Sequence, residues 1–183
     1  MARGKPEESL KKLLEAGMAL CEQQGLLELR IEDITARAGV AKGTFYLHFE
    51  NRDAFYLALH SHFHEQIAQV IVAELTLHGA GATRLLKCSQ LYLDHCLQRS
   101  GVKYLLRQLR CIPALEQAVQ LQNTRFSLLA QADFTALGFE QPEQVADLWI
   151  VMVAELAAQE SVACQAHWGA RAALQRFLTG PAV

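Results

Sequence analysis

Apolar residues recur along almost the whole chain at spacings of three and four positions, which is the period of an α-helix. The chain has 183 residues, and its four prolines and eleven glycines fall mostly between the periodic segments. Strand-like alternation of apolar and polar residues is almost absent. The pattern therefore predicts an all-α protein of about nine helices.

The breaks in this pattern predict where the helices begin and end. Pro6 suits the first turn of a helix that ends at Gly25, and Asn51 is a good N-cap for a long helix that runs to Thr76. The other helices are predicted over residues 31–38, 41–46, 83–98, 102–111, 114–137, 143–163 and 166–178, with breaks at Gly101, Pro113 and Gly138–Pro142. We expect a small N-terminal domain over residues 1–50, joined by the helix 51–76 to a second domain within residues 51–183.

The charge of the chain limits how it can bind other molecules. The formal net charge is -2, and acidic and basic residues are nearly balanced even in the first fifty positions. This balance excludes a polybasic tail that coats nucleic acid or an anionic membrane by bulk charge. A nucleic-acid partner would therefore have to be bound by a few well-placed groups.

Targeting signals and cysteines point to a cytoplasmic protein without a membrane partner. The charged N-terminus lacks a following apolar signal segment, and no stretch is long and apolar enough to cross a bilayer. The cysteines are odd in number and form no C-x-x-C pair, so neither a disulfide framework nor a zinc knuckle is indicated. They are interpreted as small buried apolar residues: Cys21, Cys88, Cys96, Cys111 and Cys164.

The segment from Ile31 to Phe55 carries the most informative motif. Its first helix has an apolar stripe that includes Ile34, Gly39 can take the left-handed conformation of a sharp turn, and Val40 fills the angle before the next helix. This arrangement is typical of a helix-turn-helix, whose second helix enters the major groove of DNA. A helical corner in an ordinary core has the same local pattern, so the turn alone does not decide between them.

The residues after the turn are more specific. The run G-V-A-K-G-T-F-Y-L-H-F, followed by Arg52 and Asp53 at the start of a long helix, closely resembles the TetR family of transcriptional repressors. The resemblance extends over about residues 9–63 and rests on helix number and length beyond residue 83. It implies an N-terminal DNA-binding domain, a C-terminal ligand-binding and dimerisation domain, and no cofactor.

Several residues of this segment suit DNA contacts. Lys42 and Thr44 lie in the first turn of the second helix, where free backbone N–H groups and the positive end of the helix dipole meet phosphates. The full set of expected DNA contacts is Arg30, Lys42, Gly43, Thr44, Tyr46, His48 and Arg52. Phe45 and Phe49 should face inward instead. Arg30 and Ala41 stand where the family commonly has Ser or Thr, so both helices are expected to lack a hydroxyl N-cap. Arg3 and Lys5 are candidates for a flexible arm in the minor groove, and a disordered start of the chain is the equally good alternative.

The resemblance also implies a ligand cavity and a dimer interface in the C-terminal region. Candidate cavity residues are Tyr92, His95, Cys96, Tyr104, Arg107, Leu109, Arg110, Phe126, Leu129 and Trp149, although core packing explains each aromatic equally well. Because a short recognition helix needs two copies for specificity, we expect a two-fold dimer. Its candidate contacts are Val145, Leu148, Met152, Leu156, Ala157, Leu174 and Phe177, which could also simply close the monomer core.

The sequence thus predicts a homodimeric DNA-binding transcription regulator, a repressor that leaves a near-palindromic operator when a small-molecule effector binds. No nucleophile, phosphate loop or convergent acid–base pair indicates an enzyme. The alternative is a helical metal- or redox-sensing protein that uses its cysteines or the His60–His64 pair, which share a helix face. A polar helix surface is the simpler interpretation of His60, His62 and His64.

Overall fold

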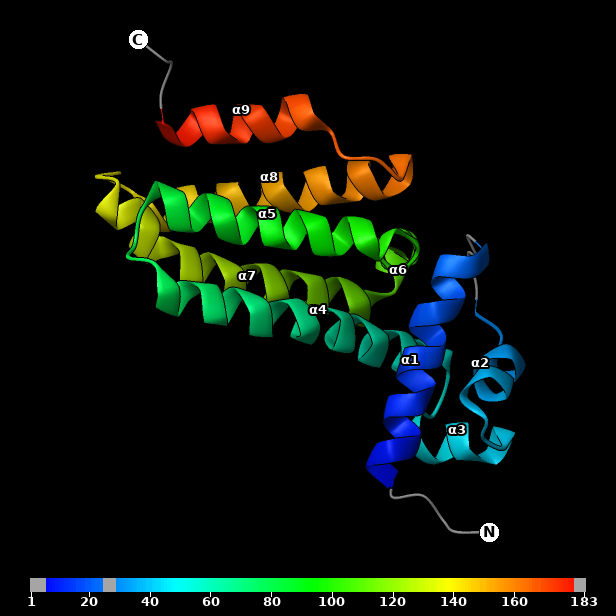
Figure 1. Ribbon diagram of the computed structural model, residues 1–183. Helices are drawn as coiled ribbons and strands as arrows, with labels where there is room; N and C mark the ends of the chain where they lie inside the picture. The colour runs from blue at the N-terminus through cyan, green and yellow to red at the C-terminus, as the bar shows by residue number, and fades with distance from the viewer. Residues whose placement is uncertain (1–5, 25–28, 180–183) are drawn as a thin grey trace. The chain divides into compact units, whose positions relative to one another are not determined.

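A computed structural model describes residues 6–24 and 29–179 of the chain, and these residues form helices without any strand. The helices are α1 (Pro6–Gln24), α2 (Ile31–Ala38), α3 (Lys42–His48), α4 (Arg52–Leu77), α5 (Ala82–Gln98), α6 (Ser100–Gln108), α7 (Pro113–Ala136), α8 (Pro142–Ala163) and α9 (Trp168–Thr179) (Figure 1). The all-α prediction is confirmed. Among the described helices, none is both long and apolar enough to span a membrane. Arg3, Lys5 and Gly25 lie outside the described residues.

The chain forms two compact units. The first comprises residues 1–63 together with 101–118, and the second comprises residues 64–100 together with 119–183. Two helices are shared between them, because α4 and α7 each begin in the first unit and end in the second. α6 belongs to the first unit although α5 and α8 belong to the second.

The first unit is built around an aromatic and aliphatic core from α1, α2, α3 and the start of α4. Phe45 and Phe55 are fully buried, and their ring centroids lie 5.5 Å apart. The hydroxyl of Tyr56 accepts a hydrogen bond of 3.1 Å from the backbone N–H of Leu29. Packing is tight enough that a Cβ on Gly17 would lie 2.6 Å from the Phe55 ring. This core holds α1, α2 and α3 in one arrangement.

Gly101 does not break the chain, as its position in the sequence suggested, but lies in the first turn of α6. A Cβ at this position would lie 2.2 Å from the backbone oxygen of Cys21, so only glycine permits α6 to pack this closely on the end of α1. The Glu22 carboxylate accepts hydrogen bonds of 3.2 Å from the backbone N–H groups of Gly101 and Val102. The break falls two residues earlier, at Arg99, which is the C-cap of α5.

The second unit packs α5, α7, α8 and α9 with the end of α4, and in Figure 1 these helices run alongside one another. Trp149 of α8 is fully buried at its centre, and its indole N–H donates a 3.0 Å hydrogen bond to the Ser89 hydroxyl. The rings of Phe134 and Phe177 lie 6.1 Å and 6.0 Å from that indole. Trp149 therefore links α5, α7, α8 and α9 in one core.

A charged cluster fixes α9 to its neighbours in this unit. The Glu160 side chain of α8 is completely buried, and its Oε2 lies 2.7 Å from Arg171 Nη2 of α9. Arg171 also pairs with Asp94 of α5, while Glu160 accepts a 2.8 Å hydrogen bond from the backbone N–H of His167. A buried carboxylate with several donors is stabilised only while all of them remain in place. The cluster therefore defines where α9 lies.

Candidate DNA-binding site and ligand cavity

The turn between α2 and α3 has the geometry that the sequence predicts. Gly39 adopts φ 66° and ψ 35°, and its N–H donates to the backbone oxygen of Ala36. The N–H of Val40 donates a 3.1 Å hydrogen bond to Thr35. Phe45 and Phe49 are buried and hold α3 against the core, as predicted. The sharp turn and the inward phenylalanines together orient one face of α3 toward solvent.

Neither α2 nor α3 has a side-chain N-cap. Arg30 and Ala41 occupy the cap positions with extended backbone, and no side chain accepts a hydrogen bond from either first turn. Lys42 and Gly43 are exposed at the start of α3. The predicted loss of the hydroxyl caps is confirmed. The exposed first turn of α3 therefore offers backbone N–H groups and a positive dipole end to an anion such as a phosphate.

Lys42 is held in an ion pair that the sequence analysis missed. Its Nζ lies 2.6 Å from Glu32 Oε1 of α2, with both side chains about half exposed. The hydrogen bond with Glu32 raises the pKa of Lys42, and the same contact lowers the pKa of the Glu32 carboxyl. The two residues are ten positions apart and meet only because the turn folds α3 back on α2. Glu32 therefore competes with any phosphate for this lysine.

His48 is also engaged within the first unit. Its Nε2 lies 2.7 Å from the hydroxyl of Ser9 on α1, and that hydroxyl donates to the backbone oxygen of Pro6 at 2.9 Å. Since the Ser9 proton is already used, His48 Nε2 is the donor in this contact. Ser9 is a second residue that sequence reasoning missed, because thirty-nine positions separate it from His48.

The remaining expected DNA contacts lie around α3. Arg30 is exposed with Nε 3.9 Å from Asp33, Arg52 is exposed at the start of α4, and Thr44 is half-buried. Tyr46 is 51% exposed, and no atom lies within 4 Å of the position a Cβ would take on Gly43. At the start of the next helix, Asn51 Oδ1 accepts a 2.9 Å hydrogen bond from Ala54 N, which confirms the predicted N-cap of α4. All seven expected contacts thus belong to the first unit.

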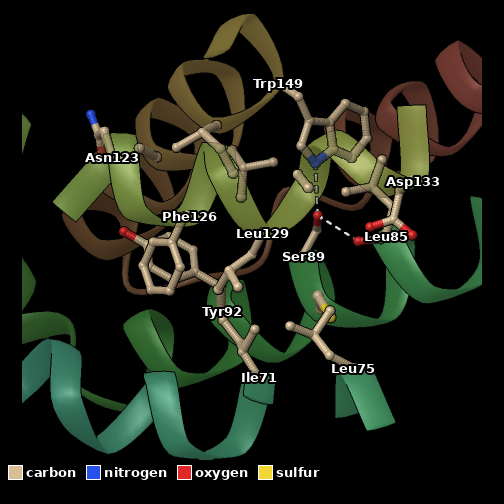
Figure 2. Close-up of a pocket in the computed structure, with 15 residues that line it drawn as sticks. Ile71, Leu75, Leu85, Ser89, Tyr92, Asn123, Phe126, Leu129, Asp133 and Trp149 are labelled. Atoms are coloured by element: carbon tan, nitrogen blue, oxygen red, sulfur yellow. Dashed lines mark hydrogen bonds between the residues drawn. The ribbon is translucent and has the colours of Figure 1, made fainter. Parts of the chain in front are cut away.

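The second unit contains a largely apolar cavity between α4, α5, α7 and α8 (Figure 2). The cavity volume is about 50 Å³. Figure 2 shows the rings of Tyr92 and Phe126 side by side, with Asn123 near them and Trp149 bonded to Ser89. The lining residues are Ile71, Leu75, Leu85, Cys88, Ser89, Tyr92, Asn123, Phe126, Leu129, Ala130, Asp133, Trp149, Ile150, Val153 and Ala154.

The cavity brings together only part of the expected ligand contacts. Tyr92, Phe126, Leu129 and Trp149 line it, whereas His95 and Cys96 belong to the same unit without lining it. Tyr104, Arg107, Leu109 and Arg110 belong to the first unit. Sequence reasoning did not single out Ile71, Leu75, Asn123 or Asp133, because core leucines and isoleucines carry no signal of a cavity.

The charged lining residue of the cavity is neutralised in place. Asp133 is 1% exposed, and its Oδ1 accepts hydrogen bonds of 2.8 Å from Arg84 Nε and from the backbone N–H of Gly81. The Ser89 hydroxyl donates to Leu85 while it accepts from Trp149. None of the lining residues has a cationic side chain, and Arg84, which pairs with Asp133, is not one of them.

The interpretation of the histidines as a polar helix surface is wrong for two of the three. His60 is 3% exposed and His64 is 8% exposed, while His62 is partly exposed with Nε2 3.1 Å from Glu15 Oε1. Burial and the charge of Lys103 lower the pKa of His60 to about 4. In the described part of the chain, no cluster of three or more His, Cys, Asp or Glu side chains could hold a metal ion.

The interpretation of the cysteines as buried is correct for Cys21 and Cys96 and wrong for Cys111 and Cys164. Cys111 lies in the short 3-10 turn after α6, and Cys164 ends α8 with φ 49°. Both lie at helix ends, where the chain leaves the core. Cys88 is half-buried, and burial raises its pKa to about 11. That thiol is a poor nucleophile at neutral pH.

One face of α8 and α9 is apolar and exposed. Leu148 is 64% exposed, Met152 is 38% exposed and Phe177 is 51% exposed. A groove between the two helices is lined by residues that include Leu156 and Leu174. Of the other expected dimer contacts, Val145 is half-buried and Ala157 is completely buried.

The class of protein follows from these features. α2, the Gly39 turn and α3 form a helix-turn-helix on the first unit, and the second unit is a separate helical body with an apolar cavity. The sequence model of the family "Bacterial regulatory proteins, tetR family" matches residues 13–59, which contain this motif. The helix-turn-helix segment of the chain is therefore similar to that of the TetR family of bacterial transcriptional regulators.

Known proteins are similar to this chain over part of its sequence and over its whole fold. It is 39% identical over 49 residues to the uncharacterized HTH-type transcriptional regulator YvdT of Bacillus subtilis, and 27% identical over 77 residues to YdgC of the same organism. These matches span 27% and 42% of this chain, and only 25% and 40% of the length of those relatives.

Solved structures resemble the chain over nearly its full length. A TetR-family regulator from Rhodococcus sp. has a TM-score of 0.77 at 19% identity, covering 94% of this chain and 97% of its own. One from Syntrophomonas wolfei has a TM-score of 0.76 at 16% identity, covering 98% and 99%. Reduced NemR of E. coli has a TM-score of 0.72 at 17% identity, covering 96% and 100%. At these identities the likeness establishes the fold alone.

Proposed function

We propose that the protein is a homodimeric repressor that binds a near-palindromic operator in the cytoplasm and releases it when a small molecule enters the cavity of the second unit. In this proposal residues 1–50 form the DNA-binding domain, and residues 51–183 form the domain that binds ligand and partner subunit. Arg30, Lys42, Gly43, Thr44, Tyr46, His48 and Arg52 contact DNA. His48 contributes to phosphate binding by turning its Nε2–H from Ser9 to a phosphate, since that proton is engaged in the free protein.

The observation that carries this proposal is the path of α4. The helix begins at Arg52, directly after the recognition helix α3, and its last turns supply Ile71 and Leu75 to the cavity wall. A ligand that displaces these side chains acts on the same helix that follows the DNA-binding motif. Ligand binding can then shift the population between DNA-binding and released states.

The small size of the cavity supports a ligand-driven change. A cavity of about 50 Å³ is smaller than a drug-sized ligand fills, so entry of such a ligand requires α4, α5, α7 or α8 to move apart. The lining is apolar, and its carboxylate Asp133 is already paired with Arg84. A carboxylate ligand would therefore find no cationic side chain in the lining to pair with. The effector we propose is therefore small, mainly apolar and without negative charge.

The exposed apolar face of α8 and α9 supports the dimer. Leu148, Met152 and Phe177 are exposed large apolar side chains, and contiguous patches of this kind mark interaction surfaces. A two-fold dimer would supply two recognition helices for one DNA duplex. Buried Leu156 and Ala157 support this face from within the subunit.

The proposal is tested by binding of the purified chain to the DNA upstream of its own coding sequence, measured by mobility shift. The double variant Lys42→Ala/Tyr46→Ala should abolish the shift, while Lys12→Ala should leave it unchanged. Lys12 is a matched control because it forms an exposed ion pair of 2.7 Å with Glu8 on α1. A wild-type protein that shifts no DNA, or a double variant that binds as well as wild type, would refute the DNA-binding function.

A further inference from the structure

The recognition helix α3 exposes one large apolar side chain that is not among the expected DNA contacts. Leu47 is 82% exposed, more than any other exposed large apolar residue in the described chain. It lies one turn after Gly43, on the same helix face, and its neighbour Tyr46 is also exposed. Because no side chain or other segment fills the space where a Cβ on Gly43 would stand, this face is open.

The polar side chains of α3 are less available for reading bases. Lys42 is bonded to Glu32, and His48 is bonded to Ser9. The helix sequence, Lys42–His48, contains no Arg, Asn or Gln. These are the side chains that most often recognise guanine or adenine through paired hydrogen bonds in the major groove. Hydrogen-bond recognition by α3 is therefore restricted, and an apolar group occupies the exposed position.

We propose that Leu47 recognises the C5-methyl group of a thymine in each half of the operator. This inference rests on the proposed DNA-binding function and names the base that α3 reads. The thymine methyl is the apolar group that a base pair displays in the major groove, so it is the natural partner of an exposed leucine there. Contact removes both groups from water, and Gly43 lets the helix backbone come close enough for that contact.

The test removes the methyl without changing any hydrogen-bonding group. The operator is first obtained by selection from a randomised duplex library with the full-length chain, and affinity is then measured by fluorescence anisotropy at constant salt. Each thymine of the half-site is replaced in turn by uracil. At one position we expect wild-type affinity to fall about fourfold per half-site, and about fifteenfold when both half-sites are changed, which is the effect of burying one methyl-sized group.

The variant Leu47→Ala should bind thymine and uracil operators equally. Leu77→Ala serves as the control, since Leu77 is 72% exposed at the end of α4, and it should keep the wild-type preference for thymine. A preference that survives in Leu47→Ala overturns the proposal, as does one that is lost only in Tyr46→Ala. Uracil tolerated at every position also overturns it. If the chain selects no sequence at all, the DNA-binding function fails and this proposal fails with it.

Discussion

Replacing Glu32 by glutamine should strengthen binding to DNA and make it more sensitive to salt. In the free protein the Glu32 carboxylate lies 2.6 Å from Lys42 Nζ and raises the pKa of that lysine. The Glu32→Gln variant removes this competitor while keeping the size of the side chain. Lys42 is then available to a phosphate in each subunit of the dimer.

The size of the effect follows from counterion release. Each phosphate contact adds about 0.9 to the slope of log affinity against log salt, so two released lysines add up to about 1.8. In the limit where Glu32 holds Lys42 away completely, the affinity advantage of the variant falls about twelvefold between about 0.1 M and 0.4 M salt. Partial competition gives a proportionally smaller change of the same sign.

The assay is fluorescence anisotropy on the selected operator at four salt concentrations. Glu8→Gln is the matched control, because the Glu8–Lys12 pair has the same exposed geometry and the same charge, but lies on α1. We expect Glu8→Gln to leave the slope unchanged. Parallel salt dependences and equal affinities for wild type and Glu32→Gln would refute the argument that this pair competes with DNA.

Further predictions concern stability, measured by urea unfolding at constant chain concentration. Gly101→Ala should destabilise the first unit, because the alanine Cβ would overlap a backbone oxygen of α1. Gly43→Ala, at an open position, should stabilise α3 by about 0.5–1 kcal/mol. Equal effects of the two variants would refute the close-packing argument. Glu160→Gln should cost about 3 kcal/mol or more, because it leaves the largely buried Arg171 with only the half-exposed Asp94 as counter-charge. Asp94→Asn should cost less than about 1 kcal/mol, and equal costs would contradict the role of burial. His60 should make the protein less stable as the pH falls. Its folded pKa of about 4 lies below the usual value, so the unfolded chain takes up the proton first and about 1.4 kcal/mol is lost by about pH 5.5. A His60→Gln variant that loses as much as wild type over that range would contradict this.

The sequence alone determined the helices, the turn and the inward face of the recognition helix. Helical periodicity, the left-handed glycine at position 39 and the N-cap at Asn51 act over three or four residues, so a linear sequence displays them fully. The same local reasoning predicted that Phe45 and Phe49 face the core. Local sequence reasoning therefore predicted each element of the helix-turn-helix and the order of these elements.

The tertiary structure alone decided which distant groups meet and which surfaces are covered. Glu32 reaches Lys42, and Ser9 reaches His48, only after α1, α2 and α3 fold against each other. The burial of His60 and the exposure of Cys164 depend on what packs on each helix, which no local pattern specifies. The same holds for the cavity, whose wall combines side chains of four helices that are far apart in sequence. Local interactions set the conformation of each segment, whereas packing between segments sets the charge, exposure and reach of its side chains.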